Sequence, residues 1–66
     1  VTARLSPRQA ILLRLAADGW SNKRIGRHEG TTEAAVGTEL YRAYRILGAA
    51  NRAHAVAIGF RTGVIR

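Results

Sequence analysis

The side chains best suited to contacting a partner lie on one face of a predicted helix over residues 33–47. At helical spacing this face carries small, hydroxyl and guanidinium side chains: Ala34, Gly37, Thr38, Tyr41, Arg42 and Arg45. Small residues let the helix backbone approach base edges, and hydroxyl and guanidinium groups hydrogen-bond to bases or phosphates. The face therefore fits a nucleic-acid contact, and it fits an ordinary solvated helix surface equally well.

A second group of polar residues stands at the start of a predicted short helix, residues 22–28. Ser21, Asn22, Lys23 and Arg24 place a hydroxyl, an amide and two cations beside the first turn of this helix. The backbone N–H groups of a first turn have no partner within the helix, and the helix dipole favours anions there. This segment therefore predicts a phosphate contact.

Residues of catalytic type are few and scattered. His28 and His54 are far apart in the sequence, and there is no cysteine. No HExxH pattern, paired carboxylates or glycine-rich phosphate loop is found. We therefore predict that the chain is not an enzyme and that it holds no metal and no cofactor.

The charge of the chain indicates the chemistry of its partner. Eleven basic and 4 acidic residues give a formal net charge of +7 on 66 residues. So strong a positive field on a small protein favours a polyanionic partner, against the plainer interpretation of a charged, soluble surface. The absence of an apolar run long enough to span a membrane, and of a leader, predicts a cytoplasmic protein.

The elements that must position these residues are four helices, over about residues 7–18, 22–28, 33–47 and 52–62. Each follows a capping residue, respectively Ser6, Ser21, Thr32 and Asn51. The segment 29–31 is a tight turn with glycine at its centre. No alternating strand pattern or repeat is present, so we expect an all-α fold in which residues 1–66 form a single helix-turn-helix domain.

Apolar spacing predicts which side of each helix is buried. The third helix has one stripe made by Val36, Leu40, Ala43 and Leu47, and Ile25 is the inward residue of the second. In the first helix the stripe is Ile11, Leu12, Leu15 and Ala16; in the fourth it is Ala53, Val56, Ala57 and Phe60. Trp20 is expected to fill a gap between helices, and residues 64–65 to fold back on the core.

Together these segments resemble the LuxR-type helix-turn-helix domain. The similarity rests on residues 5–8, 19–25 and 36–40, and on Leu47-Gly48 followed by Asn51-Arg52-Ala53 and Ala55-Val56. It runs without a gap from about residue 5 to residue 65. The last element, which leads into a fourth helix, separates this pattern from the similar region 4 helices of sigma factors.

The resemblance implies how the chain meets DNA. The helix over 33–47 would enter the major groove, with base contacts from Thr38, Tyr41 and Arg42 and a close backbone approach at Gly37. Phosphate contacts are expected from Ser21, Asn22, Lys23, Thr32 and Arg45. The fourth helix would pair with that of a second copy through Ala53, Val56 and Ala57, which predicts a near-palindromic target.

This sequence departs from the family pattern at five positions. Gln9 stands where the family usually has Glu, a small change because the helix cap is kept. Glu29 and Thr31 stand where the family usually has Leu and Ile, which predicts a looser or repacked turn. Gly37 and Glu39 stand where it usually has Lys and His, which removes one contact and brings an anion near the DNA face. The alternative is therefore a protein-interaction module that docks on RNA polymerase or another regulator without reading bases. RNA binding is a weaker alternative, because no aromatic stacking platform is found.

Overall fold

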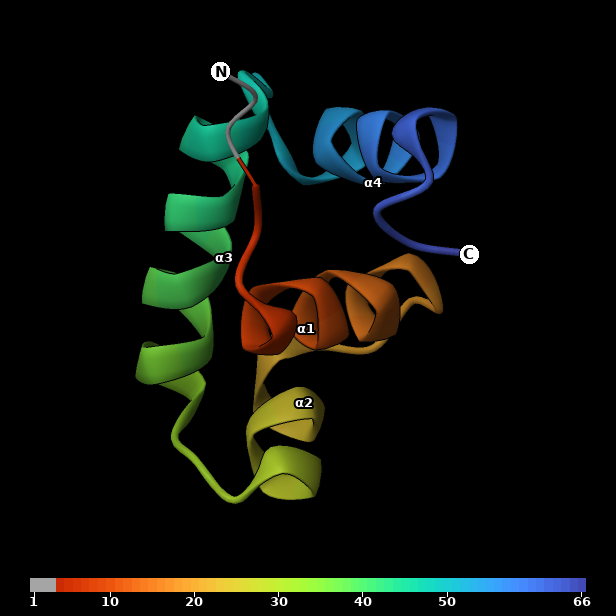
Figure 1. Ribbon diagram of the computed structural model, residues 1–66. Helices are drawn as coiled ribbons and strands as arrows, with labels where there is room; N and C mark the ends of the chain where they lie inside the picture. Colours follow the sequence, from red (N-terminus) through yellow and green to blue (C-terminus); the bar gives the residue numbers. More distant parts are fainter. Residues whose placement is uncertain (1–3) are drawn as a thin grey trace.

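The computed structural model describes residues 4–66, which form four helices and, within that range, no strand. These are α1 (Pro7–Ala17), α2 (Asn22–Glu29), α3 (Glu33–Leu47) and α4 (Arg52–Thr62). Helix α3 stands along one side of the molecule, and the other three helices lie against it, with α1 between α4 and α2 (Figure 1). The prediction of an all-α, four-helix fold is confirmed.

Local capping interactions explain where the helices begin. The side chains of Ser6, Ser21, Thr32 and Asn51 each accept a hydrogen bond from a backbone N–H three residues further on, at 2.9–3.1 Å. At α1 the bond is reciprocal, because Gln9 Oε1 accepts from the Ser6 N–H at 2.9 Å. Such caps satisfy N–H groups that the helix itself leaves without a partner.

The helix ends differ from the expected ones by one residue in two cases. Helix α1 ends at Ala17, because Asp18 leaves helical geometry as the C-cap. Helix α2 continues through Glu29, because the left-handed residue that ends it is Gly30, with φ 72°. The α2–α3 turn is closed rather than loose: the Thr31 N–H donates to the Gly26 carbonyl at 2.8 Å. In this turn Glu29 is partly buried and pairs with His28 at 2.7 Å.

The core is small and mostly aliphatic. Its largest fully buried side chains come from α1, α2 and α3: Leu12, Leu13, Ile25, Leu40 and Val36. The predicted α3 stripe is buried at Val36, Leu40 and Ala43, and Leu47 is partly buried against the same cluster. Trp20 also packs partly buried against it, and Ile65 folds back to it, as expected.

The predicted inner faces of α1 and α4 are wrong in part. Ile11 is 48% exposed, whereas Leu13, which was not part of the predicted stripe, is fully buried and Gln9 is 8% exposed. In α4 the buried residues are Ala55 and Gly59, whereas Ala53 and Ala57 are exposed and Phe60 is 46% exposed. The physical reason is close approach, because a methyl group at position 59 would lie 3.2 Å from Leu13 Cδ2.

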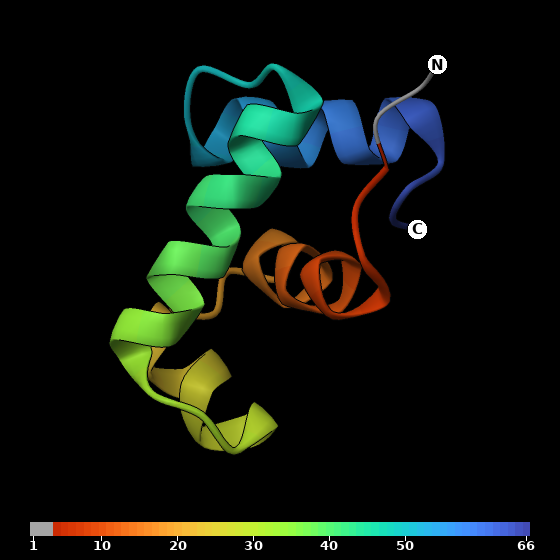
Figure 2. The same cartoon turned by 60° about the vertical axis from the view of Figure 1, so that its left-hand side comes forward.

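The turn of the helix-turn-helix unit packs against a glycine of α2. Gly26 of α2 is buried, and a methyl group there would lie 2.9 Å from the carbonyl oxygen of Thr31 and 3.1 Å from the carbonyl carbon of Thr32. The chain therefore turns back tightly against the middle of α2 before α3 begins (Figure 2). Within residues 4–66, none of the helices combines the length and the apolar character that crossing a bilayer requires.

Candidate nucleic-acid interface

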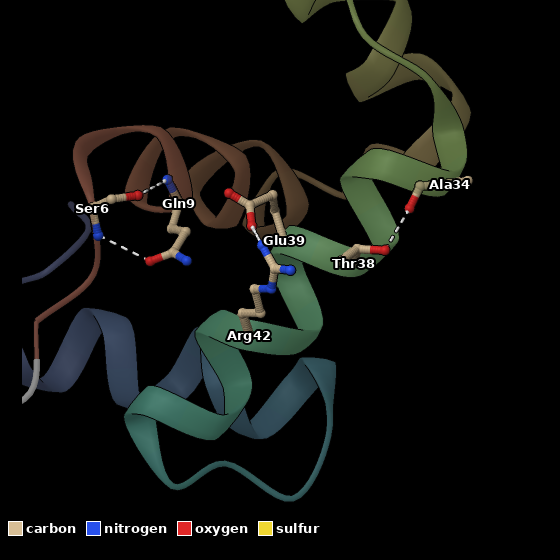
Figure 3. A network of polar contacts seen from close by, with 6 residues as sticks. All are labelled: Ser6, Gln9, Ala34, Thr38, Glu39 and Arg42. Atoms are coloured by element: carbon tan, nitrogen blue, oxygen red, sulfur yellow. Dashed lines mark hydrogen bonds and ion pairs between the residues drawn. The ribbon is translucent and has the colours of Figure 1, made fainter.

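The outer face of α3 carries the polar side chains that the sequence analysis selected. Ala34, Thr38, Tyr41, Arg42 and Arg45 are exposed, and Gly37 is partly exposed at its edge. The Thr38 hydroxyl donates to the Ala34 carbonyl at 3.1 Å (Figure 3). Its oxygen is thus left to accept a hydrogen bond from a partner.

Tyr41 and Arg45 form a pair on this face, one helical turn apart. The Arg45 guanidinium lies 5.9 Å from the centre of the Tyr41 ring, and its Nη1 is 3.4 Å from the tyrosine hydroxyl. Such a cation–π contact restrains two long side chains at modest energy. The pair presents a cation and an aromatic edge to solvent together.

Arg42 is held by Glu39. Its Nη1 donates to Glu39 Oε1 at 3.0 Å, with side-chain exposures of 66% and 29% respectively. Figure 3 shows the two side chains meeting beside α3, on the side where Gln9 of α1 lies. A contact from Arg42 to DNA therefore competes with this ion pair, and Glu39 lies at the flank of the outer face rather than at its centre.

The start of α2 presents some of its polar groups and engages others. Ser21 and Lys23 are exposed, whereas Asn22 is partly buried. Asn22 Oδ1 accepts a hydrogen bond from Arg52 Nη1 at 2.6 Å, so one acceptor position of this oxygen is taken within the chain. The Arg24 guanidinium lies 3.8 Å from the centre of the Trp20 ring, and His28 meets the same ring edge-on.

The first turn of α2 and the outer face of α3 share one edge. A methyl group at Gly37 would lie 3.6 Å from Asn22 Nδ2, and no other non-neighbouring atom would be within 4 Å. This brings Asn22 beside Gly37, as a joint surface for DNA requires. Thr32, the N-cap of α3, is exposed where the turn packs against Gly26 in the middle of α2. Its Oγ1 accepts from the Ala35 N–H at 3.0 Å.

Arg52, which was not among the predicted site residues, also belongs to this region. Arg52 Nη2 also donates to the Trp20 carbonyl, so one guanidinium binds both ends of the segment that starts α2. The cap Asn51 locates Arg52 at the start of α4, but no local pattern indicates a contact 30 residues away.

Ion pairs remove little of the positive charge from the surface. Among residues 4–66, three of the four acidic side chains pair with a neighbour: Asp18 with Arg14, Glu29 with His28, and Glu39 with Arg42. The fourth, Glu33, lies in the first turn of α3, where the helix dipole stabilises an anion. The same part of the chain contains no group of three or more His, Cys, Asp or Glu side chains able to hold a metal.

Two helices joined by a tight turn, with a polar outer face on the second, define a helix-turn-helix protein. The chain belongs to the sigma-70 region 4 family, whose model, described as Sigma-70, region 4, matches residues 1–47. This is a family of DNA-binding transcription domains and not a known enzyme family. No curated protein matches the chain.

The match ends at the last residue of α3. It therefore covers the helix-turn-helix unit and leaves out α4, Asn51 and Arg52. Those are the residues by which the sequence analysis separated a LuxR-type domain from sigma region 4. The LuxR-type assignment is not confirmed by the match.

Proposed function

We propose that this chain binds double-stranded DNA as a sequence-specific transcription regulator, with α3 in the major groove. The observation that carries the proposal is the edge shared by α2 and α3, where Asn22 lies beside the bare backbone of Gly37. A helix can approach base edges closely where it lacks side chains, while the start of the preceding helix meets the phosphates.

Within this proposal some polar residues contact bases and others contact phosphates, according to their place on the surface. Thr38 and Tyr41 are exposed near the middle of the outer face and are proposed to contact bases. Arg42 is also proposed to contact a base once its ion pair with Glu39 is broken. Phosphates are proposed to meet Ser21, Asn22, Lys23, Thr32 and Arg45. Asn22 would do so through Nδ2, because a phosphate oxygen needs a donor and Oδ1 can only accept, as it does from Arg52.

The finer assignment, a LuxR-type domain, is supported by the segment beyond the family match. Gly48 ends α3 with φ 70°, Asn51 caps α4, and Ala55 and Gly59 bury α4 against the rest of the chain. A fourth helix packed in this way leaves an outer face of Ala53, Ala57 and Phe60, with Val56 at its margin. We propose this face as the contact with a second copy.

Salt dependence tests DNA binding most directly. Each cation that neutralises a phosphate contributes about −0.9 to the slope of log K against log salt concentration. With Lys23 and Arg45 from each of two copies, affinity should fall roughly a hundredfold between about 50 and about 200 mM salt. Titration of a labelled duplex measures this, and a binding constant that hardly changes would overturn the proposal.

Matched variants test the docking face in the same assay. Lys23→Ala and Arg45→Ala should weaken all duplexes alike and make the salt slope shallower by about 1 for each phosphate that is no longer neutralised. Arg61→Ala, an exposed position in the last turn of α4, removes the same charge away from the face. If Arg61→Ala weakens binding as much as the other two, the face is misplaced.

Pairing through α4 makes a separate prediction about stoichiometry. Two copies should bind each near-palindromic duplex, with half-sites about one helical turn apart. Because the face of one helix is small, the free chain should be largely monomeric and the dimer should form on DNA. Ala57→Glu should leave one copy per duplex. Sedimentation of the complexes counts the copies, and two copies retained in this variant would contradict the α4 contact.

A second candidate function is docking on RNA polymerase. The Arg42–Glu39 pair favours it, because it neutralises a cation that base reading would use. Sigma-70 region 4 membership is consistent with either use. Salt-independent or absent duplex binding, together with capture by purified polymerase subunits, would favour this candidate.

A further inference from the structure

Arg52 connects the start of α4 to the start of α2. It is the first residue of α4 and is partly buried. Its Nη1 donates to Asn22 Oδ1 at 2.6 Å, and its Nη2 donates to the carbonyl oxygen of Trp20. The planar guanidinium fork suits two acceptors at once, whereas a lysine ammonium would make one such contact from a flexible stem.

The bond from Arg52 determines which end of the Asn22 amide faces solvent. Since Oδ1 is engaged, Nδ2 is the end that remains. Among residues 4–66 no acceptor is bonded to Nδ2, and no buried side-chain nitrogen or oxygen lacks a partner, so Nδ2 is accessible. It lies beside the space over Gly37 that a side chain would fill. A hydrogen-bond donor is thus presented at the edge shared by α2 and α3.

We infer that Arg52 is a positioning residue for DNA binding, which acts by holding Asn22 so that Nδ2 donates to a phosphate oxygen. This inference rests on the proposed function. The terminal torsion of an asparagine is broad and roughly two-fold, so the free side chain presents either its oxygen or its nitrogen. An oxygen turned to a phosphate repels it, and a nitrogen attracts it. Arg52 selects the attractive orientation before DNA arrives.

The two engaged nitrogens distinguish this role from that of an ordinary DNA-binding arginine. Arg52 makes its hydrogen bonds within the chain, so its removal should lower affinity without removing a neutralised phosphate. Replacing Arg52 by alanine removes a positive charge whether the side chain positions Asn22 or contacts DNA itself. Replacing an exposed arginine of the same helix controls for that loss of charge. Arg61 serves as this control, because it lies in the last turn of α4.

The test compares Arg52→Ala with Arg61→Ala by duplex titration at several salt concentrations. We expect Arg52→Ala to weaken binding about tenfold, the equivalent of one hydrogen bond to a charged group. Its salt slope should match that of Arg61→Ala, and Arg61→Ala itself should weaken binding by less than about twofold. A slope shallower by about 0.9 in Arg52→Ala alone would mean a direct phosphate contact and would overturn the positioning role.

Asn22→Ala and the double variant test whether Arg52 acts through Asn22. Asn22→Ala should also weaken binding about tenfold, and Arg52→Ala should add nothing to it, because both remove one hydrogen bond. Multiplied losses in the double variant would overturn the inference. Arg52→Lys should fall between the wild type and Arg52→Ala. Circular dichroism identifies the variants that are folded, and if Arg52→Ala unfolds, Arg52→Lys combined with Asn22→Ala takes its place in the cycle.

The outcomes separate this inference from the proposed function. If the wild-type chain binds duplex with a steep salt dependence and Arg52→Ala binds as Arg61→Ala does, only the positioning role is overturned. If the wild-type chain binds no duplex, both are overturned.

Discussion

Leu40→Ala is expected to lower the free energy of unfolding by about 2–5 kcal/mol. Leu40 is 1% exposed and belongs to the cluster that joins α1, α2 and α3. The substitution removes apolar contacts and leaves a cavity that a packed core closes only in part. A single core in a domain of this size rarely supplies more than about 3–5 kcal/mol, so the variant should be largely unfolded at room temperature. Urea unfolding followed by circular dichroism measures the change.

Ile11→Ala is the matched control for this prediction. Ile11 has the same number of side-chain carbons but is 48% exposed, and it lies outside the buried cluster. Its replacement should lower the free energy of unfolding by much less than Leu40→Ala does, since much of the side chain already contacts water. Equal losses at the two positions would contradict the assignment of the core.

Gly26→Ala is expected to destabilise the chain by about 1–3 kcal/mol, although alanine is the better helix former. The added methyl group would lie 2.9 Å from the Thr31 carbonyl oxygen and 3.1–3.2 Å from backbone atoms of Thr32. These are main-chain atoms of the turn, which cannot move aside as a flexible side chain can. The α2–α3 distance must increase, so DNA binding should weaken along with stability. Thermal unfolding should show a lower midpoint, by about 4–8 °C per kcal/mol.

Gly37→Ala is the control that separates packing from helix propensity. Gly37 is also within a helix, but a methyl group there meets only Asn22 Nδ2, at an ordinary 3.6 Å. This variant should therefore gain up to about 1 kcal/mol of stability. A loss of stability in Gly37→Ala, or a gain in Gly26→Ala, would contradict the assignment of Gly26 to a close contact and of Gly37 to an open helix position.

Short-range signals made most of the secondary structure predictable. The four caps act over three residues, so the types and spacing of Ser6 and Gln9, or of Thr32 and the following turn, are enough to place a helix start. The same holds for Gly30 and Gly48, whose left-handed conformations end α2 and α3. The uninterrupted α3 stripe likewise predicted its buried side.

The faces of α1 and α4 were harder to predict, because apolar residues lie on more than one side of each helix. In α4 the alanines at 53, 55 and 57 give no strong preference for one side. What selects the buried side is the close approach at Gly59, where a methyl group would lie 2.9 Å from Ile65 Cγ1 and 3.2 Å from Leu13 Cδ2; Ala55, one turn earlier, is buried on the same side. Small residues at a close helix crossing are indistinguishable by composition from small residues left in solvent.

In the candidate site too, some features follow from local sequence and others from tertiary contacts. Its residue types, the basic charge of the chain and the two helices that carry them follow from the sequence, because periodicity and capping are local. Contacts that local spacing does not specify decide which of these side chains are free to contact DNA. Arg42 pairs with Glu39 at the flank of α3, and Arg52 crosses from α4 to take the oxygen of Asn22. Side chains 30 residues apart meet only after the helices have packed, and that packing leaves Asn22 Nδ2 as the accessible end of its amide.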